Sequence, residues 1–112
     1  MSSTSDQTRL AKTFTQLRKS KSKALVSFIT VGDPTLDHTL AFLQGLVEGG
    51  VDILELGIPF SDPEAEGPSI QAANERALKG GATLKDVLDQ VKLFRKINSD
   101  TPIVLMLSLI HI

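Results

Sequence analysis

Glu55 is the residue whose position most suggests chemistry. It lies inside an apolar stretch, between Leu54 and Leu56, where a carboxylate is unusual. Burial penalises the charged form, so it raises the pKa of a carboxyl group toward the range that a general acid needs near neutral pH. The alternative is that Glu55 pairs with a lysine or accepts a hydrogen bond from a backbone amide. Position alone leaves both interpretations open.

The loop that follows carries three alternating acids, Asp62, Glu64 and Glu66. Alternating carboxylates can bind a hard cation, but this loop lacks the ordered ligand spacing of calcium loops, which favours a solvated acidic loop. His38 and His111 are too isolated to form a metal-binding pair. The sequence also has no glycine-rich phosphate-binding motif, so no metal or phosphate site is predicted within these residues.

These residues are positioned by strands that alternate with helices. The apolar runs at 24–30, 52–56 and 102–107 predict strands, each ended by glycine, proline or a change of pattern. The first run, at 24–30, is of a length typical of a strand buried on both faces, as in a parallel sheet. Helices are predicted up to about residue 20, with Thr4 and Gln7 as a capping box, and over 35–48, 69–79 and 83–97.

This alternation predicts parallel βαβ units with right-handed crossovers. In such folds chemistry lies at the carboxyl ends of the strands. Strand alternation places Glu55 on the same face as Ile53 and opposite Leu54 and Leu56. Three strands cannot close a barrel, so the chain is either a minimal doubly wound domain or the opening of a larger fold.

The bulk composition excludes several classes of function. The chain has 112 residues, of which 41% are hydrophobic and 22% charged, and its net charge is −1. This balance argues against nucleic acid and anionic membranes as partners, because both require a basic surface. The absence of cysteine excludes disulfides and thiolate metal sites. No signal peptide or membrane span is recognisable, which predicts a cytoplasmic protein.

Three longer strings are more specific than the composition. They are LVSFITVGDP at 25–34, ELGIPFSDP at 55–63 followed by Glu66-Gly67-Pro68, and IQAAN at 70–74 followed by Arg76-Ala77-Leu78. Together they resemble the tryptophan synthase alpha subunit family. The resemblance runs from about Leu10 to Met106 without an obvious gap.

The resemblance implies a fold and an activity. The family is a (β/α)₈ TIM barrel, so residues 1–106 would supply its first three βα units. It cleaves indole-3-glycerol phosphate by a retro-aldol reaction into indole and glyceraldehyde 3-phosphate. The alpha subunit needs no cofactor of its own. Its partner in the α2β2 tetramer, the beta subunit, carries pyridoxal phosphate and condenses indole with serine.

The resemblance also implies roles for individual residues. Glu55 corresponds to the acid–base that protonates indole C3 and handles the glycerol hydroxyl proton, and Glu66 to the carboxylate that holds the indole N–H. Phe28 and Met106 correspond to walls of the indole pocket. The loop with Pro59 and Asp62 corresponds to the contact with the beta subunit. The family most often has aspartate at position 66 and leucine at position 64, so this chain departs from it at both.

The last six residues, LSLIHI at 107–112, do not fit the family. They are what a transposon end used in sequencing libraries would encode, so we interpret 107–112 as a non-native tail. A chain ending there lacks five of eight strands and the late phosphate-binding loops, and is expected to be inactive alone. Two alternatives are a non-catalytic module docking on a beta subunit through Pro59 and Asp62, and a minimal doubly wound signalling domain with an acidic pocket.

Overall fold

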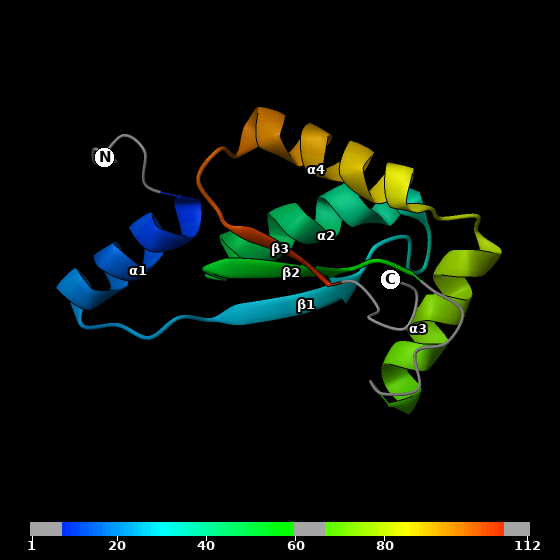
Figure 1. The fold of residues 1–112 in the computed structure, drawn as a ribbon, viewed down its shortest axis with the longest axis horizontal. Helices are drawn as coiled ribbons and strands as arrows, with labels where there is room; N and C mark the ends of the chain where they lie inside the picture. Colours follow the sequence, from blue (N-terminus) through cyan, green and yellow to red (C-terminus); the bar gives the residue numbers. More distant parts are fainter. Residues whose placement is uncertain (1–7, 60–66, 107–112) are drawn as a thin grey trace.

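The computed structural model describes residues 8–59 and 67–106, which form three strands and four helices (Figure 1). Their order along the chain is helix, strand, helix, strand, two helices, strand, as the sequence predicts. The elements are α1 (Arg9–Ser20), β1 (Val26–Thr30), α2 (Leu36–Glu48), β2 (Ile53–Gly57), α3 (Pro68–Lys79), α4 (Leu84–Ile97) and β3 (Ile103–Met106).

The three strands form one parallel sheet in the order β1-β2-β3. Phe28 of β1 and Val104 of β3 are the in-register partners of Glu55 on the central strand. Gly57 pairs in the same way with Thr30 and Met106. The parallel sheet, with α2 between its first two strands, confirms the predicted βαβ arrangement.

The hydrophobic core lies between the sheet and helices α2 and α4, which cover the same face (Figure 1). Leu54 and Leu56 project from β2 into this core and are fully buried. Leu43 of α2 and Phe94 of α4 meet them there. Glu55 therefore points away from the core, as the alternation of the strand predicts.

The opposite face of the sheet is only partly covered among the described residues, although Ile53 of β2 is buried on it. Val26 of β1 and Val104 of β3 lie on it and are 43% and 38% exposed. The prediction that the strand at 24–30 is buried on both faces is therefore wrong, because the first residue of β1 lies exposed on this side of the sheet. The apolar stripe of α4 is also only partly buried: Val87 and Phe94 enter the core, whereas Leu84, Leu88 and Ile97 are exposed.

Side-chain caps explain where two helices begin. Thr83 and Asp86 form a reciprocal capping box at the start of α4, which satisfies two backbone amides that have no partner inside the helix. Thr8 caps α1 by accepting from the Ala11 amide, so the predicted cap at Thr4 is wrong; Thr4 and Gln7 themselves lie outside the described residues. Thr35 precedes α2 without a side-chain cap and instead bonds His38 Nδ1.

Helices α1 and α3 lie at opposite ends of the sheet (Figure 1). α1 lies near the amino ends of the strands, and α3 lies near their carboxyl ends. α3 buries only Asn74 and Ala77 completely, and its main neighbour among the described elements is β1. The two ends of the sheet therefore have different surroundings, and the predicted chemistry belongs to the end at α3.

Candidate functional site

Glu55 lies at the centre of a row of side chains on the open face of the sheet. The parallel register places Phe28 on one side of it and Val104 on the other, each on an adjacent strand. Adjacent strands are about 4.8 Å apart, so these side chains are immediate neighbours. Two strands far apart in sequence thus surround one carboxylate with apolar groups.

Phe28 is held over the backbone of β2. A Cβ added to Gly57 would lie 2.5 Å from Cζ of Phe28 and 3.0 Å from its Cε2, which shows that the ring covers this glycine. Met106 is the in-register partner of Gly57 on the other side. The structure therefore brings together three predicted site residues, Glu55, Phe28 and Met106, on one face near the carboxyl ends of the strands.

Glu55 is half-buried. Among the described residues, no salt bridge or side-chain hydrogen bond involves its carboxylate. The alternative interpretation, a glutamate that pairs with a lysine or caps a backbone amide, thus has no support in that part of the chain. Within that part of the chain, the Glu55 carboxylate is therefore available to contact a bound molecule.

A second polar group lies at the same end of β1. Thr30 is 5% exposed, and its Oγ1 has no hydrogen-bond partner among residues 8–59 and 67–106. Thr30 and Phe28 both line a cavity of about 310 Å³ that β1 shares with α2 and α3. A buried hydroxyl without a partner is uncommon in folded proteins, so Thr30 offers a donor at this end of the sheet.

The remaining predicted site residues lie in and around the loop after β2. Pro59 follows β2 by two residues and is buried. Asp62 and Glu66, as well as the 107–112 tail, lie outside the described residues. Glu66 directly precedes Gly67, the N-cap residue of α3, so the chain order alone ties it to the start of that helix.

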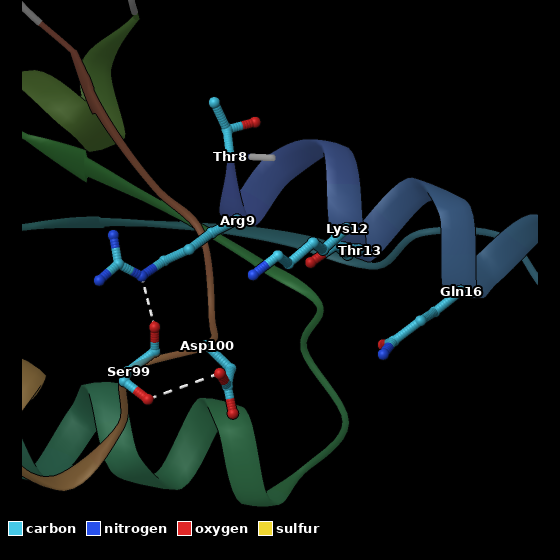
Figure 2. Close-up of a pocket in the computed structure, with 7 residues that line it drawn as sticks. All are labelled: Thr8, Arg9, Lys12, Thr13, Gln16, Ser99 and Asp100. Carbon is cyan, nitrogen blue, oxygen red and sulfur yellow. Dashed lines mark hydrogen bonds between the residues drawn. The ribbon is translucent and has the colours of Figure 1, made fainter. Parts of the chain in front are cut away.

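The opposite end of the molecule also has a cavity, of about 600 Å³, between α1 and the loop before β3 (Figure 2). Figure 2 shows the Arg9 guanidinium pointing to that loop, where its Nε donates to the carbonyl oxygen of Ser99. Lys12 and Asp100 also line it. The cavity is polar and lies at the amino ends of the strands, away from the row around Glu55, so we assign it no part in the predicted chemistry.

Two further classes of site are absent from the described ranges. No helix there is long and apolar enough to cross a lipid bilayer. The same residues contain no cluster of three or more histidine or acidic side chains placed to hold a metal ion.

A parallel α/β sheet with helices on one face and a carboxylate on the other is the arrangement found in (β/α)-barrel proteins, whose strands carry functional groups inside the barrel and at its carboxyl end. Residues 14–112 match the sequence model of the family described as tryptophan synthase alpha chain. The chain therefore belongs to the tryptophan synthase alpha chain family. This confirms the resemblance seen in the sequence.

Individual relatives give the same result. The chain is 54% identical over 98 residues to the tryptophan synthase alpha chain of Alkalilimnicola ehrlichii, a match that covers 88% of this chain and 36% of the relative. It is 60% identical over 84 residues to that of Neisseria meningitidis serogroup B, covering 75% of this chain and 32% of the relative. The chain thus spans about a third of the length of these relatives.

Solved structures agree with the fold. The tryptophan synthase alpha subunit of Legionella pneumophila superposes with a TM-score of 0.88 at 48% identity, over 89% of this chain and 38% of that chain. A structure of the tryptophan synthase α2β2 complex of Pyrococcus furiosus matches with a TM-score of 0.70 at 49% identity, covering 74% and 35%. These matches confirm the predicted fold class: the strands and helices correspond to the first βα units of a (β/α)₈ barrel.

Sequence reasoning missed several residues of this region. Thr30 and Val104 follow from the same alternation that placed Glu55, once the strand register is known. The sequence pattern marks Gly57 only as the end of a strand, although its missing side chain makes room for Phe28. The ion pair between Asp33 and Arg76 joins positions 43 residues apart and has no signal in the local sequence.

Proposed function

We propose that the complete protein containing this chain cleaves indole-3-glycerol phosphate into indole and glyceraldehyde 3-phosphate. The observation that carries the proposal is the position of Glu55: its carboxylate lies beside Phe28 and has no partner among residues 8–59 and 67–106, in a sheet that belongs to the tryptophan synthase alpha chain family. An apolar row with one carboxylate suits an aromatic substrate that must gain a proton at carbon.

The proposed reaction needs two proton transfers and one bond cleavage. Glu55 in its acid form donates a proton to C3 of the indole, and the positive charge that develops on the ring is stabilised by the Glu66 carboxylate at the indole N–H. Glu55 is then a carboxylate, because it has given up its proton. In this form it acts as the base that removes the proton of the glycerol hydroxyl next to the ring. The C–C bond breaks as that oxygen becomes the aldehyde carbonyl, and the bonding electrons return to indole.

The roles of the apolar residues follow from their places in the row. Phe28, held over Gly57, and Met106, on the far side of that glycine, are proposed as walls that orient the indole ring. Aromatic and thioether groups pack well on a flat heterocycle. This assigns orientation to apolar contacts and proton transfer to the carboxylates.

The proposed partner is a tryptophan synthase beta subunit, as in the α2β2 complex of the Pyrococcus relative. Pro59 and Asp62, in the loop after β2, are the proposed contacts. No cofactor is proposed for this chain; pyridoxal phosphate belongs to the beta subunit. The proposed location is the cytoplasm.

The test uses a chimera, because the chain spans only about a third of its relatives. Residues 8–106 replace the equivalent segment of the Alkalilimnicola alpha chain, and indole release from indole-3-glycerol phosphate is measured. We expect an active chimera in which Glu55→Gln lowers kcat by about 10²-fold or more, the size of a lost acid–base group. Glu75→Gln, at an exposed position of α3, is the matched control and should leave kcat unchanged.

Two results would count against the proposal. An inactive chimera with a native-like melting transition would refute the reaction for this sequence. An active chimera in which Glu55→Gln keeps most of its kcat would leave the reaction in place and refute the role of Glu55.

A further inference from the structure

We propose that Thr30 is a further substrate-binding residue, whose hydroxyl forms a hydrogen bond with a hydroxyl on the glycerol chain of the substrate. Thr30 ends β1 and is 5% exposed, and its Oγ1 has no hydrogen-bond partner among residues 8–59 and 67–106. A buried hydroxyl without a partner is costly, because it has lost its bonds to water and gained none in exchange. The inference rests on the proposed function, because it takes its ligand from the proposed substrate.

Thr30 lies on the same face of the sheet as Glu55. Side chains alternate along a strand, so Thr30 shares the face of Phe28, whose in-register partner is Glu55. The partner of Thr30 itself is Gly57, two residues beyond Glu55 toward the carboxyl end of β2. A strand advances by about 3.3 Å per residue and adjacent strands are about 4.8 Å apart, so the backbones at Thr30 and Glu55 are about 8 Å apart. One small substrate can contact both side chains.

The ring of Phe28 lies next to Thr30. It covers Gly57, where an added Cβ would be 2.5 Å from Cζ of Phe28. Because Gly57 is the neighbour of Thr30 on β2, the aromatic ring and the hydroxyl occupy adjacent positions at the end of the sheet. An indole ring that packs on Phe28 with its C3 at Glu55 therefore has the first carbons of its side chain within reach of Thr30.

The surroundings of Thr30 suit a neutral polar group rather than an anion. Thr30 and Phe28 line a cavity of about 310 Å³, whose charged lining residues are Asp33 and Arg76. Arg76 donates from Nε and Nη2 to the two carboxylate oxygens of Asp33, so these two charges compensate each other. A phosphate would find no uncompensated positive charge among the described lining residues.

A hydroxyl is the ligand group that matches Thr30, because each of two hydroxyls can donate to or accept from the other. The glycerol chain of the proposed substrate has two. The first, next to the ring, is the one from which Glu55 is proposed to take the proton. The second is one carbon farther from the ring, and it is the one that we assign to Thr30.

Two other buried polar side chains provide a comparison. Thr39 of α2 is 1% exposed, but its Oγ1 accepts a hydrogen bond from the Gly32 amide at 3.2 Å. Asn74 Nδ2 also lacks a partner among the described residues, but Asn74 belongs to α3 and not to the strand face that carries Glu55. Thr30 combines the missing partner with a place on that face, and Thr39 is a matched control for stability.

The experiment measures the cleavage of indole-3-glycerol phosphate by the chimera with Thr30→Val, which keeps the shape of the side chain and removes the hydroxyl. Leaving a buried substrate hydroxyl without its partner should lower kcat/KM by about 5- to 100-fold. Thr30→Ser keeps the hydroxyl and should stay within about threefold of the parent. A substrate analogue without the second chain hydroxyl should bind the parent and Thr30→Val equally, because neither complex then contains this hydrogen bond.

The melting temperature without ligand tests for a structural role of the Thr30 hydroxyl. Thr30→Val should melt at or above the temperature of the parent, because it removes no hydrogen bond seen among the described residues, whereas Thr39→Val should melt lower, because it leaves the Gly32 amide unpaired. An unchanged kcat/KM in Thr30→Val would overturn the proposal. So would an equal loss of affinity for the analogue, or a melting temperature that falls as far as that of Thr39→Val.

The same variants distinguish this proposal from the proposed function. If the parent chimera binds indole-3-glycerol phosphate without cleaving it, the proposed function fails, and the ratio of dissociation constants between the parent and Thr30→Val decides the role of Thr30. A ratio of about 5 to 100 would support that role and a ratio near one would refute it. A parent chimera that does not bind the compound at all would overturn both proposals.

Discussion

At the residue scale, the site depends on the alternation of one short strand. The sequence places Glu55 opposite Leu54 and Leu56, and the structure confirms it. The position of Phe28 over Gly57 could not be predicted in this way, because it depends on which residues of β1 and β2 lie side by side. That register is set by packing of the whole sheet on α2 and α4, and no local pattern records it.

Gly57→Ala tests this contact. The new methyl group would lie 2.5 Å from Phe28 Cζ, so the ring must turn away. Because Cζ is the far end of a half-buried side chain, we expect little loss of stability. Displacing a wall of the pocket should nevertheless lower kcat/KM for indole-3-glycerol phosphate by about tenfold in the chimera.

The double variant Gly57→Ala/Phe28→Leu is the control for Gly57→Ala. The shorter leucine relieves the collision. Gly57→Ala should therefore lower kcat/KM by a smaller factor in the Phe28→Leu background than in the parent. An equal loss of kcat/KM in both backgrounds would show that the methyl group acts on something other than the Phe28 ring.

At the element scale, the boundaries follow from turn and cap chemistry, and the sequence predicts them to within two residues for six of the seven elements. The first helix is the exception at its start, where Thr8 is the cap. Burial is less predictable than boundaries. The α4 stripe looks continuous in the sequence, yet Leu88 is 49% exposed because no neighbour is described beside that part of the helix.

Two threonines at helix starts give a matched comparison of caps. Thr83 accepts from the Asp86 amide, whereas Thr35 makes no cap bond to the backbone of α2. Thr83→Ala should therefore cost about 1 kcal/mol of stability, and Thr35→Ala clearly less. In the chimera the first loss corresponds to a melting temperature lower by about 2–4 °C. Equal shifts for the two variants would contradict this account of the caps.

At the scale of the whole molecule, helices α2 and α4 cover one face of the sheet, and the other face is only partly covered by the part of the chain that the structure describes. The composition predicts a core, and the α/β alternation predicts the parallel sheet, but neither reveals that the described residues, 8–59 and 67–106, cover one side of it much more fully than the other. Val26 and Val104 remain exposed on the open side, and β1 and β3 each have an unpaired edge among the described residues. Exposed apolar faces and free strand edges favour association.

We therefore expect the 112-residue chain, produced alone, to self-associate and to release no indole. Sedimentation velocity should show species heavier than the 12.1 kDa monomer. The double variant Val26→Lys/Val104→Lys, which charges the open face, should shift the chain toward monomer. Leu88→Lys, at an exposed apolar position on the helical side, should shift it less. A monomeric parent chain would disprove the expectation.

The bond from Arg9 to the Ser99 carbonyl has a consequence for synthesis on the ribosome. Its two ends are 90 residues apart, and the other residues beside the start of α1, such as Pro102 and Val104, also come late in the chain. Translation proceeds at about 5–20 residues per second, so the segment that α1 contacts is synthesised about 5–18 s after α1 itself. A helix of 12 residues is marginal in water, so during that interval α1 is a nascent segment open to chaperones and proteases.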